Sequence, residues 1–178
     1  MTDKERLLEL VKKHYSRQKI ILSSGKESDF YIDGKMVTLS AEGSSLLATV
    51  LKPWIEEDGI TAIGGLTLGA DPIASAISAL SVSWQNRINA FIVRKSQKSH
   101  GKLKQIEGPV SKNDKIALVD DVITSGGSIL QAADAVEKAG FEVTACYALV
   151  DRLEGGRQAI EQRGYSFKTV FTADDLRS

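Results

Sequence analysis

The chain has 178 residues, of which 42% are hydrophobic and 26% are charged, and its 23 basic residues balance its 23 acidic residues. This composition is typical of a single globular domain with a sizeable core, and zero net charge gives no indication of a nucleic-acid or anionic-membrane partner. The only cysteine, Cys146, excludes an internal disulfide and a cysteine-rich zinc site and favours a reducing cytoplasm.

The N-terminal segment predicts a helix followed by two short strands. Thr2 and Glu5 have the spacing of a capping box, and the apolar residues after them recur at helical spacing. The charges in this segment do not fit a signal peptide, and the chain lacks an apolar run of membrane-spanning length. Short strands are expected at residues 20–22 and 30–32, around a polar turn at residues 23–29.

The next segment predicts a helix and the start of the core sheet. Ser40 can cap a helix that begins at Ala41, and Pro53 within its apolar stripe predicts a kink or a break. The sheet is expected to begin at residues 60–63. A glycine-rich loop at residues 64–70 follows this strand and leads into a helix of small residues that extends through Ala79.

A strand expected at residues 90–93 precedes a long polar loop that extends to about Asn113. Residues 94–104 of this loop carry five Lys or Arg residues and no acid. Long loops without secondary structure are usually lids or binding loops, or else disordered, and cations on a lid suit a pyrophosphate leaving group. A solvated basic surface is the alternative, and the low aromatic content, 6%, argues against a nucleic-acid surface.

A strand predicted at residues 114–120 ends in two carboxylates. Residues 116–119 are all apolar, as in a strand buried on both faces of a parallel sheet. Asp120 and Asp121 precede a Thr-Ser-Gly-Gly-Ser turn, and the residues from Ile129 to Gly140 have helical spacing. Because open α/β sheets bind ligands at the carboxyl ends of their strands, this loop is the predicted site.

The loop has the chemistry of a ribose 5-phosphate site. Successive backbone N–H groups from Ile123 to Ser128 can form an anion-binding nest in front of a helix, and the hydroxyl groups in the turn can donate further hydrogen bonds. Carboxylates repel phosphate but accept hydrogen bonds from a vicinal diol, so Asp120 and Asp121 suit the sugar. The alternative is a tight strand-to-helix turn with capping residues.

The remaining residues complete an alternating pattern. Residues 142–150 predict another buried strand, residues 154–163 predict a helix that ends at Gly164, and residues 165–170 predict a last strand. Strands that alternate with helices predict an α/β fold, with a mainly parallel twisted sheet flanked by helices.

Several of these stretches resemble a known family. The acidic pair and the turn after it closely resemble the phosphoribosyl-diphosphate (PRPP) binding motif of type I phosphoribosyltransferases. The basic loop, Arg94-Lys95-x-x-Lys98-x-His100-Gly101 followed by Glu107-Gly108, resembles the catalytic loop of orotate phosphoribosyltransferases within that family. Residues 22–26, 30–33, 65–72 and 150–156 are also similar to that family and occur in its order.

The resemblance implies one domain over residues 1–178 with a small N-terminal hood, contributed by about residues 1–40 and the segment near 151–157. It implies transfer of the ribose 5-phosphate group of PRPP to orotate, giving orotidine 5-monophosphate and pyrophosphate, in pyrimidine biosynthesis. It also implies a cytoplasmic homodimer, in which the loop at residues 94–108 reaches the partner site through Lys95. Neither a nucleic acid nor a membrane is implied as a partner.

The resemblance also assigns roles to individual positions. The PRPP-binding positions are Thr67, Leu68, Arg94, Lys95, Lys98, His100, Asp120, Asp121, Val122, Ile123, Thr124, Ser125, Gly126, Gly127 and Ser128. The orotate-binding positions are Phe30, Tyr31, Thr124 and Arg152. The catalytic positions are Lys98, His100, Asp120 and Asp121, with Lys98 and His100 stabilising the leaving group. Mg²⁺ would be held through PRPP and water without a side-chain cage, with Asp120 and Asp121 as candidate contacts, and the Thr67–Leu68 loop often contains a non-proline cis peptide.

Two positions depart from the family pattern, and two other functions remain open. Some members carry a lysine where Ser23 or Gly69 stands, so Lys26 or Lys35 is a candidate source of the missing charge. A purine-base phosphoribosyltransferase and a non-catalytic PRPP-sensing regulator are the alternatives. Arg152 favours orotate because a guanidinium group matches a carboxylate bidentately, and the lid cations favour an enzyme.

Overall fold

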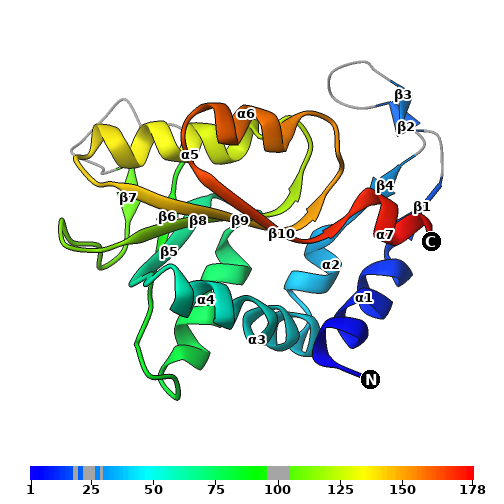
Figure 1. Ribbon diagram of the computed structural model, residues 1–178, viewed down its shortest axis with the longest axis horizontal. Helices are drawn as coiled ribbons and strands as arrows, with labels where there is room; N and C mark the ends of the chain where they lie inside the picture. Colours follow the sequence, from blue (N-terminus) through cyan, green and yellow to red (C-terminus); the bar gives the residue numbers. More distant parts are fainter. Residues whose placement is uncertain (18–19, 22–26, 29, 96–104) are drawn as a thin grey trace.

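The computed structural model describes residues 1–17, 20–21, 27–28, 30–95 and 105–178 of the chain. Its main feature is a six-stranded sheet between two layers of helices (Figure 1). The strand order is β10 (Ser166–Thr172), β9 (Val143–Asp151), β8 (Ile116–Ile123), β5 (Ala62–Leu66), β6 (Asn89–Val93) and β7 (Ile106–Glu107). Neighbouring strands are parallel except β6 and β7, which are antiparallel, so the predicted mainly parallel α/β sheet is confirmed.

Helices cover both faces of the sheet. The helices α5 (Gly127–Lys138) and α6 (Gly156–Gln162) lie on one face, and α3 (Ala41–Glu57) and α4 (Asp71–Ser81) lie on the other (Figure 1). Buried apolar residues form two clusters, and alternate residues of β8 contribute to each. Ile116 and Leu118 join the cluster that contains α5, while Ala117 and Val119 join the cluster that contains α3 and α4. Burial on both faces explains the unbroken apolar run.

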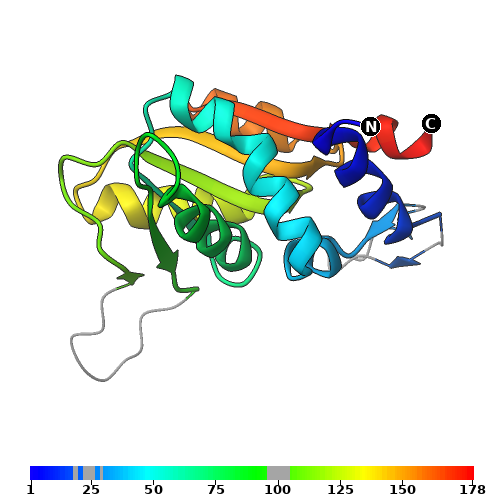
Figure 2. The ribbon, with the colours of Figure 1, turned by 90° about the horizontal axis from the view of Figure 1, so that it is seen from below.

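The N-terminal part lies at one end of the sheet (Figures 1 and 2). The helix α1 (Asp3–Lys13) begins with the predicted capping box, because the Thr2 hydroxyl accepts a hydrogen bond from the Glu5 amide at 3.2 Å and the Glu5 carboxylate accepts one from the Thr2 amide at 2.6 Å. It packs against α3 and the C-terminal helix α7 (Ala173–Arg177), which brings the two termini to the same end.

The short strands pair differently from the prediction. The strand β2 (Ile20–Ile21) pairs with β3 (Glu27–Ser28), which lies inside the predicted turn. The strand β4 (Tyr31–Ile32) pairs instead with β1 (Tyr15–Ser16), and a short helix, α2 (Gly34–Thr38), follows it. Local sequence predicted β2 and β4 but not their partners β3 and β1, since two-residue strands carry almost no periodicity.

A kink or a break was predicted at Pro53, and of these the break is wrong. The helix α3 is capped by Ser40, whose hydroxyl accepts a hydrogen bond from the Gly43 amide at 3.0 Å, and it continues through Pro53 to Glu57. Pro53 removes the amide that would pair with the carbonyl of Thr49, and both residues lie on the exposed side of the helix. Solvent can satisfy that carbonyl, while the buried Leu51 and Ile55 hold the helix against the core.

The connections that follow β5 and β8 run in opposite directions along the sheet. The chain passes from β5 through α4 to β6, whereas it passes from β8 through α5 to β9 on the other side of the sheet. The direction of winding therefore reverses between β5 and β8, and such a reversal leaves a crevice at the carboxyl ends of the two strands. Among the described residues, no helix is both long and apolar enough for a membrane crossing.

Candidate active site

Two adjoining cavities lie at the crevice between β5 and β8. The larger has a volume of about 410 Å³ and is lined by Lys35, Leu66, Thr67, Leu68, Gly69, Lys95, Asp120, Asp121, Val122 and Ser128. The smaller, of about 180 Å³, is lined by Asp120 and residues 122–128. Because the cavities share three residues (Asp120, Val122 and Ser128), one ligand can extend through both.

The cavities bring together most of the positions that the resemblance assigned to PRPP. Of the positions that the structure describes, all line one cavity or the other except Arg94, which pairs with Glu107 at 3.3 Å. Lys95 lines the larger cavity of its own chain, and its carbonyl accepts a hydrogen bond from Gln131 of α5 at 3.3 Å. Lys98 and His100 lie outside the described residues.

The acidic pair lies inside β8 rather than at its end. This strand continues to Ile123, beyond the predicted end at residue 120, because it stays paired with β9 as far as Asp151. The Asp120 carboxylate accepts a hydrogen bond from the Asp121 amide, and the Asp121 carboxylate accepts one from the Val122 amide, both at 3.0 Å. The two side chains are therefore oriented by local backbone at the cavity wall.

Burial and a neighbouring charge perturb one member of the acidic pair, Asp120. Desolvation, with the charge of Asp121 as the next cause, raises the pKa of Asp120 to about 7. The positive charge of Lys35 acts in the opposite direction on the pKa of Asp120. The Nζ atom of Lys35 lies 3.5 Å from Oδ2 of Asp121, and the charge of that carboxylate raises the pKa of Lys35. A desolvated carboxylate of this kind is a strong acceptor for a sugar hydroxyl.

The loop after β5 packs directly against the acidic pair. The Thr67–Leu68 peptide is cis, as the resemblance led us to expect, and the Thr67 hydroxyl donates a hydrogen bond to Asp71 at 2.7 Å. A Cβ atom at Gly69 would lie 2.0 Å from Oδ1 of Asp120 and 2.8 Å from Oδ1 of Asp121. A side chain at position 69 would therefore require the Asp120 and Asp121 carboxylates to shift from this arrangement.

The loop after β8 requires glycine at its end. Gly126 has φ +80°, and a Cβ atom there would also lie 3.0 Å from the carbonyl of Gly156 at the start of α6. A Cβ atom at Gly156 would in turn lie 2.3 Å from Cγ2 of Ile123. The loops after β8 and β9 therefore pack tightly, and the backbone of residues 123–128 faces the smaller cavity ahead of α5.

Arg152 lies beside this loop because of strand register. Ile123 is opposite Asp151, so the next residue of β9 continues alongside, and the Arg152 amide donates a hydrogen bond to the Ile123 carbonyl at 2.9 Å. The Arg152 guanidinium is 5.2 Å from the centre of the Phe30 ring and 2.7 Å from Oε1 of Glu154. Of the positions assigned to orotate, Phe30 and Arg152 are thus in contact, Thr124 lines the adjoining cavity, and Tyr31 is exposed.

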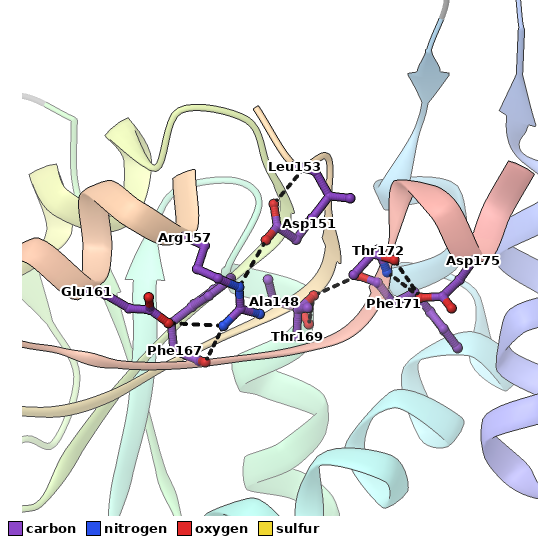
Figure 3. A network of polar contacts seen from close by, with 10 residues as sticks. All are labelled: Ala148, Asp151, Leu153, Arg157, Glu161, Phe167, Thr169, Phe171, Thr172 and Asp175. Atoms are coloured by element: carbon purple, nitrogen blue, oxygen red, sulfur yellow. Dashed lines mark hydrogen bonds and ion pairs between the residues drawn. The ribbon is translucent and has the colours of Figure 1, made fainter. Parts of the chain in front are cut away.

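A buried carboxylate holds the segment that carries Arg152 (Figure 3). Asp151 is fully buried, accepts a hydrogen bond from the Leu153 amide at 2.9 Å and lies 3.7 Å from Nε of Arg157. Arg157 also donates hydrogen bonds to Glu161 and to the carbonyl of Phe167. Leu153 has φ +61°, a conformation that this network supports. Asp151 and Arg157 had no predicted role, although an acid at the end of an apolar strand was the available signal.

The site offers oxygen ligands suited to Mg²⁺ but no complete protein cage. Asp120 and Asp121 line the larger cavity, and carboxylates are hard ligands that Mg²⁺ accepts. Within the described part of the chain, no cluster of three or more His, Cys, Asp or Glu residues could hold a metal ion. Since Mg²⁺ usually keeps several waters and uses substrate phosphates as ligands, two carboxylates are sufficient.

Comparison with known proteins agrees with this geometry. Residues 57–173 match the model of the phosphoribosyl transferase domain family. An orotate phosphoribosyltransferase from Aquifex aeolicus (strain VF5) is 41% identical, over 99% of this chain and 98% of that protein.

Two crystal structures of Mycobacterium tuberculosis H37Rv orotate phosphoribosyltransferase have the same fold. The complex with Fe(III) dicitrate has a TM-score of 0.86 at 37% identity and covers 98% of this chain and 99% of that one. The complex with PRPP has a TM-score of 0.83 at 34% identity and covers 99% of this chain and all of that one. The chain described here belongs to the orotate phosphoribosyltransferase family.

Proposed function

We propose that this chain transfers the ribose 5-phosphate group of PRPP to orotate, giving orotidine 5-monophosphate and pyrophosphate. The observation that carries this proposal is the position of the acidic pair, between the loop at residues 67–69 and the anion-binding loop at residues 123–128. A ligand with a diphosphate at one end, a diol in the middle and a phosphate at the other matches that order of groups.

The proposed binding mode assigns one part of PRPP to each wall. The backbone N–H groups and hydroxyls of residues 123–128 bind the 5-phosphate at the start of α5, and Asp120 and Asp121 accept hydrogen bonds from the ribose hydroxyls. Thr67 and Leu68 bind the diphosphate, and in the homodimer proposed below Lys95 joins them from the other chain. Orotate binds beside Phe30, Tyr31 and Thr124 and presents its carboxylate to Arg152, whose guanidinium can donate two parallel hydrogen bonds.

The proposed reaction breaks the bond between the anomeric carbon and the diphosphate oxygen and forms a bond to the orotate ring nitrogen. The electron pair leaves with pyrophosphate, and the proton of the ring nitrogen is released to solvent. The chain contributes by holding the sugar, aligning the nitrogen and stabilising charge on the leaving oxygens. Lys98 and His100 supply that stabilisation, with Arg94 nearby, and His100 is the candidate proton donor. Bound Mg²⁺ would neutralise diphosphate charge, held by substrate oxygens, water and the Asp120 and Asp121 carboxylates.

We also propose a cytoplasmic homodimer in which residues 94–108 complete the partner site. The test is to mix two inactive variants, Lys98→Ala and Asp121→Asn. If the loop acts on the partner, the mixed dimer contains one intact site and recovers turnover. If the loop acts on its own chain, both sites of the mixed dimer stay defective and turnover remains absent.

The proposed reaction is tested by following the ultraviolet absorbance of orotate with PRPP and Mg²⁺, against controls that lack each component. Loss of absorbance that requires all three components supports the proposal. Turnover of a purine base in place of orotate would identify a purine-base phosphoribosyltransferase. PRPP binding without transfer to any base would identify a PRPP-sensing regulator.

A further inference from the structure

Lys35 is a cation in the larger cavity that the PRPP-binding positions do not include. Its ammonium group lies 3.5 Å from Oδ2 of Asp121 and 3.8 Å from Oδ1 of Asp33. Lys35 lines the same cavity as Lys95 and the loop that contains the cis peptide between Thr67 and Leu68. Of the two lysines that were candidates for the missing charge, Lys26 lies outside the described residues, and Lys35 is in the site.

The fold brings Lys35 to this position through a close helix–strand contact. A Cβ atom at Gly34 would lie 2.8 Å from Oδ2 of Asp121 and 3.0 Å from Cγ2 of Val122, so glycine lets α2 begin close to β8 without displacing these side chains. The Asp33 carboxylate caps this helix by accepting a hydrogen bond from the Lys35 amide at 3.2 Å. The backbone of Lys35 is therefore fixed at the cavity wall, while its side chain is 47% exposed.

The charge of the cavity favours a second cation beside Lys95. Two carboxylates line the cavity, and the loop that faces them has glycine at position 69, so that position supplies no cation. A diphosphate adds further negative charge beside these acids, and unpaired like charges in a partly buried site are costly. Because the Lys35 side chain is half-exposed, its ammonium group is not held in a buried position and can move from Asp121 to a nearby phosphate oxygen.

We propose that Lys35 is a substrate-binding residue, whose ammonium group pairs with Asp121 in the free protein and with the diphosphate oxygens of PRPP in the complex. This inference rests on the proposed function for the identity of its ligand. Lys35 acts in binding and charge balance, and it takes no part in proton transfer.

The test compares Lys35→Gln and Lys35→Arg with Lys112→Gln, which removes an exposed lysine from the turn before β8, outside both cavities. Calorimetric titration with inorganic pyrophosphate and Mg²⁺ measures the diphosphate site directly, and steady-state kinetics measure KM for PRPP and orotate. For Lys35→Gln we expect about a tenfold increase in both the pyrophosphate Kd and the PRPP KM, with the orotate KM changed less than about twofold. Lys35→Arg should recover most of the loss, and Lys112→Gln should match the wild type.

An unchanged pyrophosphate Kd in folded Lys35→Gln would overturn the inference, as would a defect confined to orotate. An equal loss in Lys35→Arg would also overturn it, since the retained charge should suffice. The two proposals fail separately. A wild type that binds pyrophosphate through Lys35 but transfers nothing to orotate contradicts the proposed function alone, whereas normal transfer with Lys35-independent pyrophosphate binding contradicts this inference alone.

Discussion

The guanidinium group of Arg152 is paired with a carboxylate of its own segment, because its Nη2 lies 2.7 Å from Oε1 of Glu154. The Arg152 side chain is 7% exposed and the Glu154 side chain is 38% exposed, so the pair lies at the boundary between the site and solvent. In the proposed complex, the carboxylate of orotate approaches the same guanidinium. Glu154 then competes with orotate for the guanidinium group, and its negative charge lies near the negative charge of the orotate carboxylate.

Replacement of Glu154 by glutamine should tighten orotate binding. The neutral amide removes the competing charge, and pairs of this exposure contribute up to about 1 kcal/mol, so the KM for orotate should fall by about three- to fivefold with the PRPP KM unchanged. The control is Glu42→Gln, which removes an ion pair with Arg6 at 2.8 Å on α3, outside both cavities. A higher orotate KM in Glu154→Gln would show that Glu154 helps the substrate to bind.

Asp120 should make the protein less stable as the pH rises. Its pKa of about 7 in the folded protein lies above its ordinary value of 3.8, so the folded state holds the proton more tightly than the unfolded state does. The free energy of unfolding therefore falls as the pH rises from about 4 through about 7. Asp120→Asn removes this effect, so its Tm should exceed that of the wild type by roughly 5 °C at pH 8 and by less at pH 5.

Asp114 offers a control with the opposite sign. Although partial burial acts in the other direction, hydrogen bonds from Ser111 and Thr61 lower the pKa of Asp114. Its stabilisation is present above the unfolded pKa and is lost as the pH falls through the folded pKa, so Asp114→Asn should lower the Tm at pH 8. If the Tm difference between the wild type and Asp120→Asn did not change with pH, this would contradict the raised pKa of the buried Asp120 carboxylate.

Replacement of the buried Asp151 should impair both stability and orotate binding. Asp151→Asn weakens the contact with Arg157 and the hydrogen bond from Leu153, and we expect a loss of about 2 kcal/mol in the free energy of unfolding. The orotate KM should rise because the segment carrying Arg152 is no longer fixed, while the PRPP KM should change little.

Glu161→Gln is the matched control for Asp151, since it removes a half-exposed partner of the same Arg157 guanidinium at 3.1 Å. An exposed pair of this kind contributes about 0.5 kcal/mol and should leave both KM values unchanged. Equal effects of the two substitutions would mean that Asp151 does not position Arg152.

The sheet and the phosphate-type loop could be predicted from the sequence because their signals are local. The apolar run at residues 116–119 reflects burial on both faces, and the acids, hydroxyls and glycines after it are consecutive. Family resemblance added the cis peptide and the candidate role of Arg152. The strand end was misplaced because pairing with β9, which local sequence does not encode, extends β8 to Ile123.

Other features could not be predicted because they depend on contacts between distant segments. The antiparallel edge strand β7 and the short helices α2 and α7 have too few residues for a periodic pattern. The pairing of Asp151 with Arg157 depends on how β9 meets α6, and the approach of Lys35 to Asp121 depends on the packing of α2 against β8. The effect of Pro53 depended on which side of α3 faces solvent.

The most direct test of the central claim compares orotate with uracil, which lacks the carboxylate, as acceptors for PRPP in the wild type and in Arg152→Gln. We expect efficient transfer to orotate and at least about a hundredfold lower kcat/KM for uracil, since removing a charge-assisted bidentate contact costs about 3 kcal/mol. In Arg152→Gln that preference should largely disappear through loss of orotate turnover. Equal use of orotate and uracil by the wild type, or an unchanged preference in Arg152→Gln, would contradict the account.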